Sequence, residues 1–444
     1  MNLTYLKLQN TTVMEYSMDD DYYKIIHEDM LPISMRGTVK DTSSNTTCVT
    51  KEIIKKNERL IKGFCSRRCL SLDRENAKKI YNALKISQAD DEEAKEKITK
   101  LCKGVSVTDD YWITDNNDEK WEDINVRENP LHKTLAQISL FGKSLSITGK
   151  IRTPELTAQG CYAKAWVRKN GHLYLLKAGT KNGNEPQMEA LTSKILDCTN
   201  VPHVEYVLKK TEQKIVTCCP AMTNKVFSMI PVVEISAWCQ RNDMNFLDYV
   251  KTKDAEMYWK TIIVDYLCAN SDRHDGNWGF YMDNRTGKIL RIHPLYDHNN
   301  AFDSEFMADK TGGECQLIPN TNQKKAAHYA IKQCDFRITK PISRKIFPDD
   351  TTYFCFMERA TELGLFRKRK VPFLEKITQK RPELYEATEI KKDNSIKYWI
   401  SLKKMTEEKT NDKSKTQKEN WARIVVPAIT IPATLNVDDE TWNF

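Results

Sequence analysis

The chain has 444 residues, of which 40% are hydrophobic and 29% are charged, and its formal net charge is +8 at pH 7. A chain of this length can form two or three lobes, each around its own hydrophobic core. The mild positive charge permits binding to nucleic acid or to an acidic partner but does not indicate either. No apolar run is long enough to span a membrane and no signal peptide opens the sequence, so we expect a soluble protein of the cytoplasm without membrane contact.

The 13 cysteines are scattered along the chain and lack the repeated C-x₂-C spacing of zinc sites. Cys65 and Cys69 come closest to a metal-binding spacing, but the nearby histidines do not complete a site. The neighbouring Cys218 and Cys219 lie in an apolar stretch. The sequence therefore predicts reduced and mostly buried thiols rather than a zinc site or a disulfide framework.

Residues 1–146 are predicted to form an N-terminal accessory domain of α/β character that shows no catalytic chemistry. Short strands are expected at 4–13 and 22–33, a strand and a turn at 104–112, and helices at 71–85, 90–101 and 129–140. The rest of the first 65 residues has no clear periodicity. We expect this region to support the remainder of the chain.

A strand, a turn and a second strand begin the next region, residues 147–228. Lys177 ends the second strand, which is otherwise apolar. Such a lysine either extends to solvent or points into a cleft at a phosphate. A helix beginning at Pro186 carries Glu189, and a glutamate on a helix beside a lysine on a strand is the ion pair with which kinases position the lysine. The pair favours the second interpretation.

The loop at 153–164, which precedes these strands, has Gly160 as its one glycine. Small residues around Gly160 permit backbone N–H groups to approach phosphates, although they do not require it. A hairpin is expected at 204–208 and 214–219. Its exit at Cys219 has the position of a hinge between two lobes, where the backbone would face an adenine ring.

Three polar residues further along the chain are not explained by apolar packing: Asp272, Asn277 and Asp297. A helix is expected at 258–267 and strands at 278–282 and 289–295. Asp272 follows the helix, Asn277 opens the first strand, and Asp297 lies just beyond the second. The hairpin would bring Asn277 and Asp297 side by side, with Asp272 a few residues upstream.

Phosphoryl transfer from ATP requires these groups. A carboxylate must orient the attacking hydroxyl, and hard oxygen ligands must hold Mg²⁺ against the phosphates. Asp272 and Asn277 have the Asp-x-x-x-x-Asn spacing of the kinase catalytic loop, and Asp297 stands where the second metal ligand lies. Each could instead be structural, with Asp272 capping a helix, Asn277 starting a strand and Asp297 forming a turn. Their order and spacing favour a kinase.

Residues 229–404 are predicted to form a largely helical lobe. The polar segment 302–322, which contains a Gly-Gly pair, is a candidate substrate-side loop. Helices are expected at 324–334, 350–363, 371–381 and 390–404. Residues 405–444 are predicted to form a polar, lysine-rich tether and a C-terminal tail.

Two segments resemble the double signature of HipA-like serine/threonine kinases: Asn270-Ser271-Asp272-Arg273-His274-Asp275-Gly276-Asn277-Trp278-Gly279 and Pro294-Leu295-Tyr296-Asp297. Upstream, Thr157-x-x-Gly160-x-x-x-Lys164 is similar to the phosphate loop of that family, and Leu175-Leu176-Lys177 to its ATP-lysine strand. The segment 106–112 also resembles HipA-like proteins. The resemblance covers roughly residues 100–305 and is most specific in the signature around Asp272.

The resemblance implies an α+β, protein-kinase-like fold of HipA type. It implies a small β-rich N-lobe at 147–228, a helical C-lobe at 229–404 and an accessory region at 1–146. ATP and Mg²⁺ are the implied cosubstrates, and the implied reaction transfers the γ-phosphate to serine or threonine of a protein substrate.

By position in the family's motifs, Asp272 would be the catalytic base, and Asn277 and Asp297 the metal ligands. Lys177 would contact the phosphates, with Glu189 as its partner. Asn277 and Lys177 would thus belong to the catalytic set together with Asp272.

Further nucleotide-binding positions implied by the resemblance are Thr157, Gly160 and Cys219. Thr157 stands where the family carries a loop serine whose autophosphorylation switches the kinase off, because a phosphate there adds negative charge beside ATP. The sequence departs from the family in having threonine at this position. It also has His298-Asn299-Asn300 after Asp297, where the family has glycine.

Three functions remain open on these grounds. An active protein kinase is favoured, either as the toxin of a toxin–antitoxin pair with a small DNA-binding antitoxin or as a stand-alone relative. A phosphoinositide-like lipid or small-molecule kinase shares the Asp-Arg-His-x-x-Asn core, but no basic amphipathic stretch for a membrane accompanies it. The third possibility is a catalytically silent nucleotide-binding protein. Such a protein would be expected to have lost one of the central residues of the site, and all of these are present: Asp272, Asn277, Asp297 and Lys177.

Overall fold

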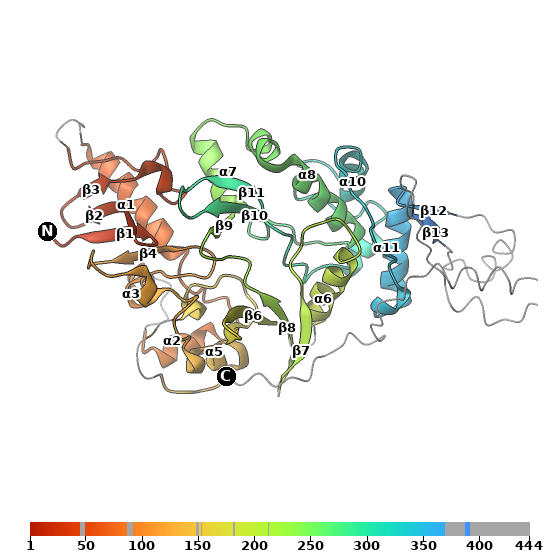
Figure 1. Cartoon of the computed structure of the whole chain (residues 1–444), viewed down its shortest axis with the longest axis horizontal. Helices are drawn as coiled ribbons and strands as arrows, with labels where there is room; N and C mark the ends of the chain where they lie inside the picture. Colours follow the sequence, from red (N-terminus) through yellow and green to blue (C-terminus); the bar gives the residue numbers. More distant parts are fainter. Residues whose placement is uncertain are drawn as a thin grey trace, which may run out of the picture.

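The computed structural model describes residues 1–44, 49–86, 92–147, 151, 153–180, 183–211, 213–368 and 387–390. Within these ranges the chain forms four antiparallel sheets, three of them with three or four strands, and its two longest helices span Lys51–Ser66 and Phe246–Leu267 (Figure 1). This mixture of helices and antiparallel sheets confirms the predicted α+β class. A part rich in strands precedes a mainly helical part, as predicted.

The first sheet lies in the N-terminal region and has the strand order β3-β2-β1-β4. Its strands are β1 (Thr4–Leu8), β2 (Thr11–Ser17), β3 (Tyr22–Ile25) and β4 (Tyr111–Thr114). Strand β4 pairs with β1 although it lies far along the chain, and all four of its residues are buried. The helices of this region are α1 (Lys51–Ser66), α2 (Ala77–Ala83), α3 (Glu92–Cys102), α4 (Trp121–Ile124) and α5 (Lys133–Phe141), with the short 3-10 turn η1 (Glu28–Met30).

Helix α1 is the largest element that was not predicted from the sequence. The side chain of Thr50 caps its N-terminus by accepting a hydrogen bond from a backbone N–H of the first turn. Its buried face contains Asn57, which both accepts from the N–H of Lys40 and donates to its C=O. Ile54, Ile61 and Phe64 recur on this face, so the sequence does contain the apolar period of a helix.

The second sheet has the strand order β5-β6-β8-β7. Its strands are β5 (Lys164–Lys169), β6 (His172–Ala178), β7 (Val207–Lys210) and β8 (Ile215–Pro220), and helix α6 (Glu185–Leu196) packs on them. Asn170 and Gly171 join β5 to β6 with φ of 51° and 79°. Positive φ at both positions is typical of the two-residue turn that suits the twist of a hairpin, which confirms the predicted turn.

The third sheet has the order β11-β10-β9 and belongs to the helical part. It consists of β9 (Phe227–Pro231), β10 (Gly279–Asp283) and β11 (Ile289–Ile292). The helices are α7 (Val232–Arg241), α8 (Phe246–Leu267), α9 (Ser304–Ala308), α10 (Gln323–Ala330) and α11 (Asp350–Glu362), and β12 (Phe366–Lys368) pairs with β13 (Ala387–Ile390). A Cβ atom at Gly279 would lie 2.0 Å from the carbonyl oxygen of Ile230, so the close approach of β9 and β10 requires glycine there.

Most predicted helices and strands are confirmed. The strand predicted at 4–13 is instead the hairpin of β1 and β2, the strand at 22–33 ends with β3 at Ile25, the strand at 104–112 begins only with β4 at Tyr111, and the helix at 258–267 is the second half of α8. Strand β9 was not predicted, since its partner β10 lies far ahead in the chain. The helix predicted at 390–404 is wrong at its start, because Ile390 ends strand β13; the rest of it, the helix at 371–381 and the tail at 405–444 lie outside the described residues. The limits of the four predicted segments stay a prediction, and the limit at 228 falls inside β9.

One hydrophobic core joins the N-terminal region to the helical part. Leu6 and Phe64 of the first region belong to the same buried cluster as Ile230, Tyr258 and Phe280 of the second. A separate small cluster packs α2 and α5 against Leu156, in the 3-10 turn η2 (Pro154–Leu156). No helix in the described ranges is long and apolar enough to cross a membrane.

Asp110 is a buried carboxylate that connects three segments distant in sequence. It accepts hydrogen bonds from Gln9 Nε2 at 2.8 Å, from Asn284 Nδ2 at 2.8 Å, and from the guanidinium of Arg127 at 2.9 Å. Burial raises the pKa of Asp110 and the charge of Arg127 opposes that rise. Asp110, in the segment 106–112, therefore connects the first sheet to the β10–β11 turn.

We expect Asp110→Ala to lower the free energy of unfolding by about 3–5 kcal/mol, because it leaves the buried guanidinium of Arg127 without its carboxylate. Urea denaturation followed by circular dichroism measures the change. Asp115→Ala, at an exposed position a few residues away, is the matched control and should cost less than about 0.5 kcal/mol. Equal costs for the two variants would contradict this role of Asp110.

Candidate active site

Lys177 and Glu189 form a buried ion pair at the centre of the second sheet. Lys177 lies in β6, opposite Lys164 of β5 and Thr217 of β8. Its Nζ lies 3.1 Å from Glu189 Oε1, and Thr217 donates to the other oxygen of Glu189 at 2.7 Å. The glutamate on α6 is thereby fixed by both neighbouring strands of the sheet.

Asp297 is the second carboxylate bound to Lys177. It follows the third sheet in the chain, so this ion pair connects the second sheet to the helical part. Burial would lower the pKa of Lys177, but Asp297 and Glu189 together raise it, so the lysine is charged at neutral pH. Burial likewise would raise the pKa of Asp297, and Lys177 holds it below its usual value. Asp297 has a φ of 56°, a backbone conformation that aspartate tolerates better than most residues.

Arg273 positions the loop that contains Asp272 and Asn277. Its side chain is buried and forms an ion pair with Asp265 of α8 at 3.0 Å. It also donates to the carbonyl oxygens of Asn277 at 2.6 Å and Tyr296 at 3.0 Å. One guanidinium thus connects the end of α8, the loop after it and the residue before Asp297.

Asp272 presents a partly exposed carboxylate at the edge of this loop. Asn300 Nδ2 donates to Asp272 Oδ2 at 2.9 Å, and Asn277 Nδ2 donates to the backbone oxygen of Asp272 at 2.9 Å. The side chain of Asp272 is 33% exposed, whereas Asn277 is buried. A hydroxyl from outside can therefore reach the carboxylate, whose orientation Asn300 restrains.

The donor groups at Asn277 and Asp297 fit a magnesium ion. Because the amide nitrogen of Asn277 donates to Asp272, its amide oxygen is turned to the other side and is free of that bond. An amide oxygen and a carboxylate are hard ligands of the kind that Mg²⁺ binds together with phosphate oxygens and water. No cluster of three or more His, Cys, Asp or Glu side chains suited to a metal occurs among the residues that the structure describes.

The loop 157–163 closes over the lysines. Gly160 has a φ of 91°, and a Cβ atom there would lie 2.7 Å from Lys164 Nζ. Lys164 is buried and donates to the carbonyl of Gln159 at 2.5 Å; burial, followed by the charge of Lys177, lowers its pKa to about 7. The ring of Tyr162 lies 5.4 Å from Lys177 Nζ. The loop and Lys164 thus lie beside the Lys177 ion pairs.

Two of the predicted nucleotide-binding positions have side chains that point elsewhere. The hydroxyl of Thr157 is buried and donates to the carbonyl of Val105 at 3.0 Å. Cys219 is buried among apolar residues of β7, β8 and α6, although its backbone extends beyond the last residue of β8 that pairs with β7, Cys218. Any contact of Cys219 with a nucleotide would therefore involve its backbone.

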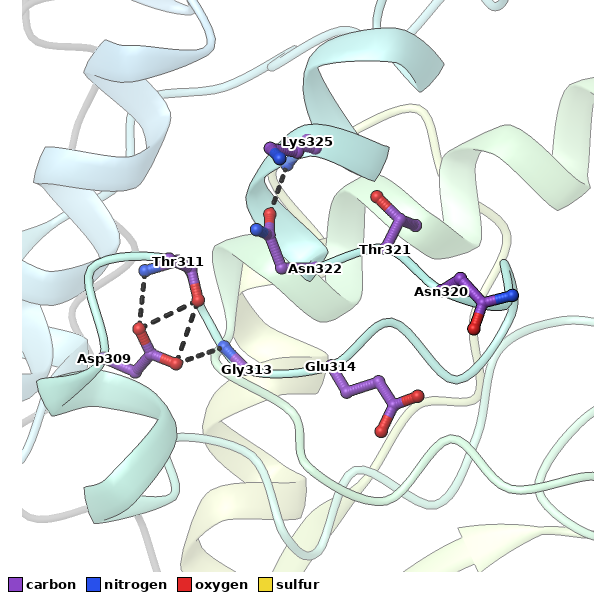
Figure 2. Close-up of a pocket in the computed structure, with 8 residues that line it drawn as sticks. All are labelled: Asp309, Thr311, Gly313, Glu314, Asn320, Thr321, Asn322 and Lys325. Carbon is purple, nitrogen blue, oxygen red and sulfur yellow. Dashed lines mark hydrogen bonds between the residues drawn. The ribbon is translucent and has the colours of Figure 1, made fainter.

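The predicted substrate-side loop adjoins the residues before Asp272. Gln316 donates to the carbonyl of Ser271 at 3.0 Å, and Gln323 to that of Asn270 at 2.7 Å. Figure 2 shows the polar hollow beside this loop, in which the carboxylate of Asp309 points to Thr311 and Gly313. Its volume is about 370 Å³ and it is lined by Asp309, Thr311, Gly313, Glu314, Asn320, Thr321, Asn322 and Lys325. The role of this loop stays a prediction.

Several residues of this site were not singled out from the sequence. Arg273 lies inside the motif between Asp272 and Asn277, and that position was the available signal. Asn300 replaces part of the expected glycine segment after Asp297, and the structure gives it a bond to Asp272. Thr217 had no signal, because its role depends on strand pairing across the sheet.

His293 gives this region a pH dependence that can be measured. It is buried between β11 and Asp297, its Nδ1 is bonded to the carbonyl of Pro294 at 2.9 Å, and its Nε2 has no partner among the described residues. Burial lowers its pKa to about 4. As pH falls below 6.5 the unfolded chain takes up this proton before the folded chain does, so stability is lost as pH falls.

We expect the wild type to lose about 3 kcal/mol more of its free energy of unfolding than His293→Phe does between pH 7 and pH 4. Phenylalanine keeps an aromatic ring between Tyr281 and Tyr296. Urea denaturation of both proteins across this pH range gives the two slopes. The interpretation fails if the slopes are the same.

No protein-family model matches the chain. The chain is 23% identical over 151 residues to the serine/threonine-protein kinase CtkA of Helicobacter pylori, an alignment covering 29% of this chain and 46% of that kinase. The chain thus spans about half the length of the curated relative that it matches.

Two solved structures are similar to the chain. The crystal structure of the H. pylori proinflammatory kinase CtkA has a TM-score of 0.35 and 15% identity, over 46% of this chain and 90% of that one. HipA of Shewanella oneidensis MR-1, in a toxin–antitoxin complex with HipB and operator DNA, has a TM-score of 0.41 and 10% identity, over 81% of this chain and 95% of that one. The sequence alignment supports the predicted resemblance to serine/threonine kinases.

Proposed function

We propose that this chain is an ATP- and Mg²⁺-dependent protein kinase that phosphorylates serine or threonine of a protein substrate. The observation that carries the proposal is the buried Lys177, which is bound both to Glu189 of α6 and to Asp297 beyond the third sheet. This arrangement joins the phosphate-contacting lysine of a kinase to a metal-binding carboxylate. The sequence similarity to a serine/threonine-protein kinase supports it.

In this proposal the chain binds ATP between the second sheet and the helical part. Bound ATP and Mg²⁺ supply the transferable phosphoryl group and neutralise its charge. Lys177 binds the phosphates, and Asn277 and Asp297 hold the metal. Lys164, whose buried side chain lies under the loop at Gly160, adds a second positive charge on the phosphate side.

Asp272 is the proposed base. Its carboxylate accepts one hydrogen bond from Asn300 and is one-third exposed, so an oxygen of the carboxylate can accept the proton of an incoming hydroxyl. A hydroxyl bound there is oriented by the carboxylate before transfer, which is the main contribution a kinase residue makes at this position. Gln316 and Gln323 would keep the substrate-side loop next to this carboxylate.

The proposal includes the setting in which the kinase works. HipA of S. oneidensis is found with HipB and operator DNA, and we propose a small DNA-binding antitoxin as a partner of this chain too. The cytoplasm is the proposed compartment, since the cysteine spacing in the sequence does not suggest a disulfide framework. The hydroxyl of Thr157 is buried, so phosphorylation there would require the loop to leave its place first.

The test is incubation of the purified protein with γ-labelled ATP and Mg²⁺, beside Asp272→Ala and Asp297→Ala, with mass spectrometry of the products. We expect label on serine or threonine with the wild type and a loss of at least about 100-fold in either variant, since each removes a positioned charge from the transfer step. Asp275→Asn is the control, because Asp275 is exposed and lies three residues from Asp272. It should keep most of the activity.

Other outcomes are informative as well. Label on a lipid or a small molecule but on no protein would replace the protein substrate by one of those classes. The absence of ATP binding in the wild type would overturn the proposal of a kinase altogether.

Lys164 predicts how ATP binding depends on pH. Its pKa is about 7 without ATP, and phosphates nearby would favour its charged form, so binding takes up a proton. We expect ATP affinity to fall by up to about tenfold per pH unit above pH 7, and Lys164→Met to remove most of this slope. Titration calorimetry at pH 8 in two buffers of different ionisation enthalpy measures the proton uptake directly. Identical heats in the two buffers would contradict the prediction.

A further inference from the structure

Arg74 is a buried arginine of the N-terminal region that binds both ends of the loop 157–163. Its guanidinium donates to the carbonyl oxygens of Glu155 at 2.9 Å, Ala158 at 3.4 Å and Lys164 at 2.7 Å. Ser139 of α5 lies against the same guanidinium and also donates to the carbonyl of Lys164. Helix α5 packs on β5 and β6, and α2 packs on α5 (Figure 1).

The neighbours of Arg74 hold the middle of the same loop. The backbone N–H of Glu75 donates to the carbonyl of Cys161 at 2.8 Å. Gln159 reaches back in the other direction, donating to the carbonyl of Arg67 at 2.7 Å and that of Cys69 at 3.0 Å. The segment 67–75 therefore contacts the loop along its whole length.

Burying the charge of Arg74 costs free energy, which indicates that its contacts with the loop have a role. A guanidinium in the interior is normally paired with a carboxylate, but within the described residues Arg74 donates to carbonyl oxygens and to one hydroxyl, and its Nε has no partner there. Burial lowers its pKa to about 10, and the charge of Glu155 opposes that shift. Arginine remains charged at neutral pH, so the chain keeps an expensive buried charge at this place.

The carbonyl oxygens that Arg74 and Glu75 bind are the groups that would repel a phosphate. A carbonyl oxygen carries partial negative charge, whereas a loop that binds phosphate must present its N–H groups. The carbonyls at 155, 158, 161 and 164 are all bonded to the N-terminal region, and the carbonyl of Gln159 is bonded to Lys164. The carbonyls at 155, 158, 161 and 164 are thus turned to the N-terminal region and away from the place where the phosphates would lie, while that of Gln159 is bonded to a positive charge.

We propose that Arg74 is a positioning residue for nucleotide binding, and that the segment 67–75 holds the loop 157–163 in the conformation that accepts the phosphates. This inference rests on the proposed kinase function, and it gives the N-terminal region a role in setting the affinity for ATP. Arg74 acts through the loop backbone and does not touch the substrate or the phosphates. Loosening it changes how readily ATP binds and leaves the transfer step itself intact.

The experiment compares Arg74→Lys, Arg74→Met and Gln159→Leu with the wild type for KM of ATP, kcat and thermal stability. We expect Arg74→Met to raise KM by at least about tenfold while kcat stays within about twofold, because charge-assisted hydrogen bonds to the loop are lost. Arg74→Lys should recover part of the loss, since a lysine can still reach one carbonyl. Gln159 is exposed, so Gln159→Leu should fold normally and raise KM by about two- to fivefold.

The loop carries its own reporter. Cys161 is an exposed free thiol at the middle of the loop, and its rate of alkylation can be read by peptide mass spectrometry. Arg74→Met and Gln159→Leu should increase this rate and weaken the protection that ATP gives. Arg36→Met is the matched control, because Arg36 is another arginine of the N-terminal region that donates to backbone carbonyls, and these belong to Leu31 and Gly287, outside the segment 67–75 and the loop.

The outcomes separate the two proposals. If the wild type does not bind ATP, the kinase proposal fails, and the alkylation rate of Cys161 still shows whether Arg74 restrains the loop. If the wild type binds ATP while KM and the alkylation rate are unchanged in folded Arg74→Lys and Gln159→Leu, the inference about Arg74 is overturned and the kinase proposal stands. Should Arg74→Met fail to fold, these two milder variants decide the question.

Discussion

The buried ion pair between Asp265 and Arg273 is the interaction on which the geometry of the site depends. A guanidinium offers five donors in a rigid fork, so Arg273 can bind a carboxylate on α8 and two backbone carbonyls at the same time. A lysine has one donor centre on a flexible chain and could not hold three segments in register. The relative positions of Asp272, Asn277 and Asp297 are therefore maintained by a residue that takes no part in the chemistry.

The site has more negative than positive charge around Lys177, and this suits its proposed ligands. Lys177 is bound by two carboxylates, so this buried group carries one negative charge more than neutrality requires. A divalent cation would change this net charge from −1 to +1, which suits an anionic ligand such as a phosphate, whereas a neutral ligand would leave it at −1. Lys164 stands on the other side with a proton that it holds only weakly at neutral pH. The site can thus adjust its charge when an anion and a cation arrive together.

The sequence predicted those parts of the site that lie within short segments. The spacing of Asp272 and Asn277, the strand that ends in Lys177 and the helix that bears Glu189 are local patterns, and the structure contains all of these elements. Arg74 and Thr217 act through contacts between segments distant in the chain, for which one sequence has no signal. Helix α1 was not predicted, although its apolar residues recur with helical spacing around one buried asparagine. The loop at Gly160 was recognised, yet what holds it in place was not.

The continuous core between the first sheet and the helical part limits how far the chain can be shortened. Because Leu6 and Phe280 share one buried cluster, the N-terminal region and the catalytic part cannot separate without exposing apolar surface on both. A shorter version cut before residue 147 would expose one face of that core, so the smallest stable unit of this chain is larger than its kinase-like motifs alone suggest.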